Sequence, residues 1–187
     1  MGEISQALKE WAVVVEALLA GDLLLLLRKG GIREEKGRFA VKADRVLLFP
    51  TYEHQQADLV KAPYQQQVQP LALGAPPVVP LCGWAEITHS LPLERESQVL
   101  ALDPFHIWSQ RFVQERWTWK PSSPLYLLLL RSHHLPEPYS LPQRPEYGGC
   151  RSWISLTETV STAGSTPVLA AAEYEARVKA VLKALEA

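Results

Sequence analysis

The sequence predicts an α+β fold, with a mixed, mainly antiparallel sheet of five to seven strands flanked by an N-terminal and a C-terminal helix. Three observations predict this fold. Apolar runs of strand length recur along the chain, and glycine, proline or charged residues bound them. Apolar residues recur at helical spacing near both ends. No internal repeat of fixed period is present, which argues against a solenoid.

The elements follow from these patterns in chain order. Ile4, Leu8, Trp11 and Val15 predict an amphipathic helix over 4–20. Thr51 is a candidate cap for a helix that starts at Tyr52. The remaining predictions are strands at 23–27, 39–41, 46–49, 81–93, 124–135 and 152–156, helical segments at 97–102 and 104–117, irregular connections at 63–80 and 136–145, and a linker at 160–166 before a final helix over 167–186.

Composition limits the class of protein. A chain of 187 residues with 47% apolar and 21% charged residues is typical of a single globular domain, here 1–187. The net charge of −1 argues against broad electrostatic capture of nucleic acid, although a local basic patch is compatible with it. Cys82 and Cys150 are too few for a disulfide scaffold, so a cytoplasmic location is expected. Charged residues and glycine interrupt the apolar stretch 12–27, so no membrane span is predicted.

Two turns that combine glycine pairs with cations predict an anion-binding site. Arg28, Lys29, Gly30 and Gly31 follow the strand at 23–27, and Gly148, Gly149 and Arg151 precede the last strand. Exposed amides beside cations can hold a phosphate or carboxylate. Arg131 and His133 share one strand face at the end of the run 124–135, and they complete the candidate set. The alternative is a pair of tight turns with solvated basic ends, because the full phosphate-loop pattern is absent.

A second group of residues predicts acid-base or metal chemistry. Glu53 and His54 follow a strand end, and Glu34 lies in the charged segment before it, so these three are the candidate catalytic residues. No metal-ligand spacing is present, and no metal site is predicted. Cys150 after two glycines suggests a nucleophile, but the sequence fixes no partner histidine, and the reactivity of this thiol stays open.

Several segments together resemble one known family. RKGGIREE at 28–35, LLFPTYEHQ at 47–55 and YGGCRSWISL at 147–156 resemble the DUF1802 family of uncharacterised prokaryotic proteins, over about 11–156. The resemblance implies a nucleic-acid context, with a loose link to restriction-modification systems. It implies no catalytic residues.

Three functions remain open. The first is a nucleic-acid or nucleotide-phosphate binding protein. The second is a metal-dependent nuclease or other phosphodiester hydrolase, for which clustered carboxylates are required. The third is a protein-interaction or structural subunit that uses the tryptophan-rich segment and the final helix. The partner is expected to be nucleic acid or a phosphorylated ligand, and the final helix packs on the body or on a second copy of the chain. The sequence identifies no cofactor.

Overall fold

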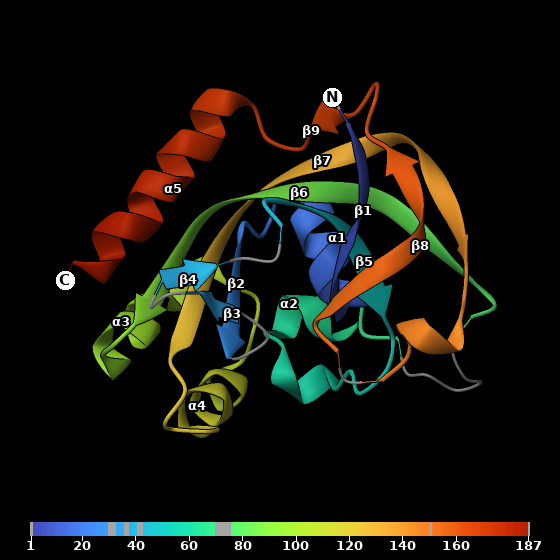
Figure 1. The fold of residues 1–187 in the computed structure, drawn as a ribbon. Helices are drawn as coiled ribbons and strands as arrows, with labels where there is room; N and C mark the ends of the chain where they lie inside the picture. The colour runs from blue at the N-terminus through green and yellow to red at the C-terminus, as the bar shows by residue number, and fades with distance from the viewer. Residues whose placement is uncertain are drawn as a thin grey trace.

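Seven strands form one curved sheet in the described part of this computed structural model (Figure 1). The structure describes residues 2–29, 33–35, 38–40, 43–69, 76–149 and 151–186, with only the backbone at 33–35 and 38–40. The strand order is β2–β7–β6–β5–β1–β8, and β9 pairs with β7. The strands are β1 (Glu3–Trp11), β2 (Leu25–Lys29), β5 (Arg45–Thr51), β6 (Val78–Leu93), β7 (Leu125–Pro142), β8 (Trp153–Ser161) and β9 (Thr166–Pro167).

The sheet is mixed and mainly antiparallel, as the sequence predicts. Only β1 and β5 pair in parallel among the described strands of this sheet. A separate antiparallel pair is formed by β3 (Arg33–Glu35) and β4 (Arg38–Ala40). The helices are α1 (Ala12–Ala20), α2 (Ala62–Gln65), α3 (Glu96–Ala101), α4 (Gln110–Thr118) and α5 (Ala171–Leu185), with short 3-10 turns at Ala57–Leu59, Asp103–Phe105 and Pro145–Tyr147. The α+β class is therefore confirmed.

The two faces of the sheet carry two apolar clusters. On β5, Val46 and Leu48 belong to the larger cluster, while Leu47 and Phe49 belong to the smaller one. Side chains alternate between faces along a strand, so β5 is buried on both sides. The long strands β6 and β7 arch over the other strands (Figure 1) and supply residues to both clusters. In the part of the chain that the structure describes, no helix has the length and apolar character needed to cross a membrane.

The predicted helix over 4–20 is wrong in its first half. Glu3–Trp11 is the strand β1, which lies between β5 and β8, and the helix α1 begins only at Ala12. Three consecutive residues of this strand, Ala7, Leu8 and Lys9, are buried because both faces are covered. A strand of this kind lacks the alternation of a half-exposed strand, and its apolar positions imitate helical spacing.

The predicted loop at 136–145 is also wrong in large part, because β7 continues to Pro142. Its prolines are accommodated by an irregularity in the pairing with β6. Gly83 pairs with His134 but Leu81 pairs with Tyr139, so the segment 135–138, with Pro136 and Pro138, bulges out of register. Proline lacks a backbone donor, and bulges are among the few positions in a sheet that tolerate it.

Three helix boundaries differ from the predictions. Residues 52–56 form a turn rather than a helix start, and His54 there has a φ of 62°. The predicted helix 104–117 is divided, since α4 begins at Gln110 after Ser109, whose Oγ accepts a hydrogen bond from the Phe112 amide at 3.3 Å. At the C-terminus, β8 runs to Ser161 and β9 occupies 166–167, so α5 starts at Ala171 rather than at 167.

Candidate functional site

Several strand ends converge on one pocket of about 340 Å³, which we call the strand-end pocket. The C-terminal ends of β1, β2 and β5 reach it, as do the last turn of α4 and the segment before β8. Its lining includes five cationic side chains but only two carboxylates. The cations are Lys9, Arg28, Lys29, Arg116 and Arg151, and the carboxylates are Glu10 and Glu53. An excess of positive charge around one cavity favours an anionic ligand.

Arg28 forms the floor of the strand-end pocket, and both of its terminal nitrogens are engaged with protein groups, whereas its buried Nε has no hydrogen-bond partner among the described residues. One terminal nitrogen donates to the Ser152 hydroxyl at 2.8 Å, and the other donates to the Lys9 carbonyl at 2.7 Å and lies 2.6 Å from the Glu10 carboxylate. Burial raises the pKa of Glu10, although the positive charges of Arg28 and Arg116 oppose this effect. Arg28 therefore ties β2 to β1 and to the start of β8, and its charge is balanced locally.

Lys9 holds the turn that carries Arg151. Its Nζ donates to the carbonyls of Tyr147 at 2.9 Å and Gly149 at 2.8 Å, and it lies 3.8 Å from the Glu53 carboxylate. Lys9 is buried, so these contacts take the place of water. The amide of Arg151 donates to the Gly149 carbonyl at 2.9 Å, which continues the turn. Lys9 is thus a positioning residue beneath the rim.

Lys29 and Arg116 are charged groups in a poorly hydrated place. The ammonium of Lys29 donates to the Trp117 carbonyl. Burial lowers the pKa of Lys29, and the positive charge of Arg116 lowers it further. Burial also lowers the pKa of Arg116; repulsion from Arg28 adds to this effect, and attraction to Glu10 opposes it. The positive charges of the pocket repel one another, so an anion bound there would stabilise the charged forms of both Lys29 and Arg116.

The rim presents groups whose hydrogen-bonding capacity is free. Among the residues that the structure describes, the side chains of Arg116, Arg151 and His54 have no hydrogen-bond or ion-pair partner, whereas Arg28 and Lys9 have several. Trp119 is 46% exposed at the same rim, and the Arg116 guanidinium lies 5.7 Å from its ring centre. A free guanidinium offers a rigid fork of donors suited to phosphate, and an exposed indole offers a stacking surface.

The candidate catalytic residues are only partly brought together. Glu53 and His54 line the strand-end pocket, where the Glu53 amide donates to the Thr51 hydroxyl at 3.3 Å in the turn after β5. Glu34 lies in β3, and its side chain is outside the described residues. The described residues contain no group of three or more His, Cys, Asp or Glu side chains that could hold a metal ion.

Arg131 and His133 lie away from the strand-end pocket, so the predicted convergence of all the anion-binding residues is wrong for these two. Arg131 is 5.7 Å from the ring of Tyr174, which α5 places over the sheet. His133 stacks on Trp84 at 4.1 Å, and its Nδ1 is 3.1 Å from the Arg131 carbonyl. Burial lowers the pKa of His133. The Arg131 side chain therefore contacts α5, and the His133 side chain packs between β7 and β6.

Of the other predicted residues, the neighbours Arg28 and Lys29 meet the distant Arg151 in the strand-end pocket. Gly30, Gly31 and Cys150 lie outside the described residues. Sequence reasoning missed Lys9 and Glu10 and left Arg116 out of the candidate set, while Trp119 belongs to the tryptophan-rich segment that it did single out. The available signal was the pair Lys9-Glu10 inside an apolar segment, which the prediction of a helix assigned to a surface.

Comparisons with known proteins identify a family and two distant structures. A family model described as "Domain of unknown function (DUF1802)" matches residues 7–180. No curated protein matches the chain at a significant level. Crystal structures of two mutants of ZmASCH from Zymomonas mobilis are similar to it. The serine-to-alanine mutant is 11% identical, with a TM-score of 0.47 and coverage of 82% of this chain and 88% of that chain. The tyrosine-to-phenylalanine mutant is 13% identical, with a TM-score of 0.46 and coverage of 82% and 90%.

Proposed function

The chain belongs to the DUF1802 family, a domain of unknown function, and we propose that it binds nucleic acid through phosphate contacts in the strand-end pocket. The observation that carries this proposal is the pair of guanidinium groups at the rim, Arg116 and Arg151, which have no hydrogen-bond or ion-pair partner among the described residues and lie above a floor with more cations than carboxylates. Phosphate contacts supply most of the affinity of proteins for nucleic acids, and arginine is well suited to them.

Trp119 directs the proposal toward single strands. An exposed indole beside an arginine stacks an unpaired base, and stacking with a basic track is the usual mode of single-strand recognition. A pocket of about 340 Å³ has the dimensions of a small-ligand site, which suits one nucleotide unit better than the side of a duplex. The net charge of −1 fits a local contact rather than capture along a basic face.

Binding of a labelled single-stranded oligonucleotide across a salt series tests the proposal, with a duplex of the same sequence beside it. Arg116→Ala and Arg151→Ala each should weaken single-strand binding by about 1–2 kcal/mol and reduce the salt slope by about 1. Arg144→Ala is the matched control, because Arg144 is an exposed arginine that does not line the pocket. Absence of binding at low salt, or equal losses in all three variants, would overturn the proposal.

The hydrolase alternative shares this pocket, since Glu53 and His54 line it beside the cations. It receives less support, because Glu53 is paired with Lys9 and the described residues offer no three-ligand cluster. Cleavage read on the same samples with Mg²⁺ tests it, and His54→Ala should abolish any cleavage while preserving binding. The subunit alternative predicts a continuous apolar surface. The exposed large apolar side chains among the described residues are Val78, Leu100 and Trp119, which come from different elements.

A further inference from the structure

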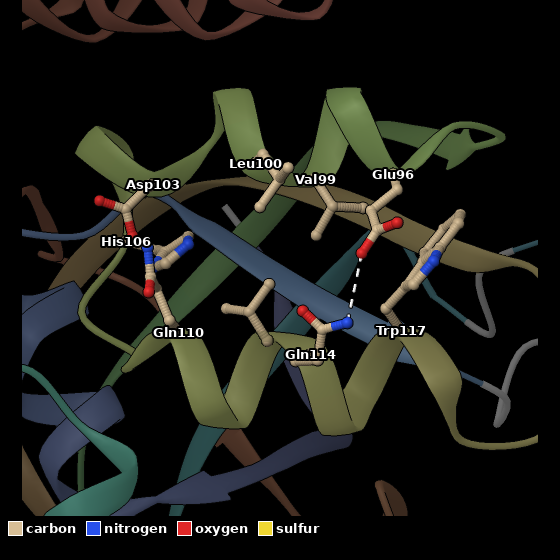
Figure 2. Close-up of a pocket in the computed structure, with 9 residues that line it drawn as sticks. Glu96, Val99, Leu100, Asp103, His106, Gln110, Gln114 and Trp117 are labelled. Atoms are coloured by element: carbon tan, nitrogen blue, oxygen red, sulfur yellow. Dashed lines mark hydrogen bonds between the residues drawn. The ribbon is translucent and has the colours of Figure 1, made fainter.

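A second cavity, of about 290 Å³, lies between α3 and α4, and we call it the helix pocket (Figure 2). It shares no lining residue with the strand-end pocket. Val99 and Leu100 of α3 face Val113 of α4 across its middle. Polar groups occupy its two ends. Figure 2 places Asp103, His106 and Gln110 at one end and Glu96, Gln114 and Trp117 at the other.

His106 is the group that nothing in the described structure explains. It is 5% exposed, and neither ring nitrogen has a hydrogen-bond partner among the described residues. Trp108 packs against the ring at 5.6 Å between ring centres, while the imidazole lines the helix pocket. Buried polar atoms are nearly always paired, and each one left unpaired costs about 1–3 kcal/mol. The cavity is therefore where a partner for this imidazole belongs.

The charged side chains that line the helix pocket determine whether its ligand is a cation or an anion. Glu96 and Asp103 line it, and no lysine or arginine does. The Glu96 carboxylate accepts from the Gln114 amide at 3.3 Å, and Asp103 lies 3.4 Å from the Lys61 ammonium, which approaches from outside the cavity. Both carboxylates retain free acceptor positions. Lys61 offsets part of the negative charge at the Asp103 end, while the Glu96 carboxylate has no cationic partner among the described residues, so the lining favours ligands with positive charge over anions.

We propose that the helix pocket binds a linear aliphatic diamine, with one ammonium at the Asp103 end, the other at the Glu96 end, and the methylene chain between Val99, Leu100 and Val113. The His106 imidazole accepts a hydrogen bond from the first ammonium, and Trp117, whose ring centre lies 5.8 Å from the Lys29 ammonium, lines the end of the cavity that receives the second. Gln110 and Gln114 are one helical turn apart, or about 6 Å, which matches a chain of four or five methylenes. This inference does not rest on the strand-end pocket.

The proposal is tested by titrating the whole chain with 1,5-diaminopentane at constant ionic strength. The readouts are calorimetry and the ring signals of His106 in long-range ¹H–¹⁵N spectra. Saturable binding with a shift of the His106 ring nitrogens is expected. Pentylamine and 1,5-pentanediol keep the chain length but remove one or both charges, and each should bind at least about tenfold more weakly. Equal binding of the diol and the diamine, or no His106 shift at millimolar diamine, would overturn the proposal.

Variants separate this pocket from nonspecific attraction of amines. Glu96→Gln should weaken diamine binding about tenfold, and Leu100→Lys should also weaken it by adding a cation beside the mouth of the cavity. Both positions lie on the exposed side of α3, with Leu100 55% exposed, so the fold tolerates these changes. Glu175→Gln on α5 is the matched control and should leave binding unchanged. If Glu175→Gln weakens binding as much as Glu96→Gln, the amine is held by net charge alone and the assignment fails.

Discussion

The Arg28 guanidinium lies 2.6 Å from the Glu10 carboxylate, and this pair closes the gap between β2 and β1 at the floor of the strand-end pocket. Only 14% of the Arg28 side chain and 15% of the Glu10 side chain are exposed. Removing one partner of such a pair leaves the other charge without a counter-charge in a poorly hydrated place. Arg28 was expected to be an anion ligand, but its contacts make it first a structural residue.

Arg28→Met should lower the free energy of unfolding by about 2–3 kcal/mol, because Glu10 loses its counter-charge and Ser152 loses a donor. The double variant Glu10→Leu with Arg28→Met should recover about half of that loss, since no isolated charge remains. Urea unfolding of the three proteins measures both effects. A single variant of unchanged stability would show that the pair contributes nothing to the fold.

Trp119→Ala should weaken single-stranded nucleic-acid binding by about 1–3 kcal/mol and leave duplex binding unchanged, because only an unpaired base can stack on the indole. Stability should change little, since the side chain is 46% exposed. Trp119→Tyr keeps an aromatic face and should retain most of the affinity. Fluorescence anisotropy with labelled oligonucleotides provides the measurement. Equal losses on single strands and duplexes would contradict a stacking role.

His106 should make the protein less stable in mild acid. Burial lowers the pKa of His106 to about 4; the positive charge of Lys61 adds to this effect, and the negative charge of Asp103 opposes it. Between pH 6.5 and 4 the unfolded chain binds a proton at this site that the folded chain does not bind, so stability falls as the pH falls. The loss from pH 7 to pH 5 should be about 2 kcal/mol.

His106→Phe provides the comparison, because it preserves the ring while removing the titration and the unpaired nitrogens. Its unfolding free energy should depend less on pH than that of the unaltered chain, by about 2 kcal/mol between pH 7 and pH 5. Urea unfolding at both values measures the difference. Identical pH profiles would mean that His106 is protonated in the folded protein as easily as in the unfolded chain.

Two glycines should respond differently to alanine. A methyl group at Gly83 would lie 2.5 Å from the His133 carbonyl oxygen and would also overlap Leu19, so Gly83→Ala should cost about 3 kcal/mol or more. Gly149 has a φ of 77° but open space around it, so Gly149→Ala should cost only about 1 kcal/mol. Thermal unfolding of both variants checks the order. A tolerated Gly83→Ala would contradict the close approach of α1 and β7 to β6.

The sequence predicts those parts of the fold in which each residue's environment is local. The runs at 23–27 and 46–49 have apolar residues at every position, bounded by charged residues or proline, and they overlap the strands β2 and β5. β1 was missed because its burial is imposed by neighbours from distant parts of the chain. Nothing near Lys9 in the sequence indicates that two carbonyls from 147–149 will bury its ammonium.

The same reason explains which residues of the candidate site the sequence predicts and which it does not. Arg28, Lys29 and Arg151 were recognisable because glycines accompany them, and glycine marks a turn in any context. No glycine accompanies Arg116, which is one of several charged residues on α4. Arg116 reaches the pocket because it lies in the last turn of that helix. Arg131 was misplaced because β7 continues to Pro142, so Arg131 lies within the strand rather than at its end.

The position of β1 also has a consequence for how the chain reaches this structure. The strand nearest the N-terminus pairs with one of the last strands, and Gln6 Nε2 reaches Ser155 Oγ, 149 positions away, at 2.9 Å. During synthesis, one edge of β1 stays unpaired until the residues of β8 have left the ribosome. Closing so long a loop lowers the chain entropy before the strand pairing contributes any stabilisation. Folding should therefore be slow for a domain of this size. The nascent chain therefore exposes an unpaired edge of β1 to other chains until β8 has been made.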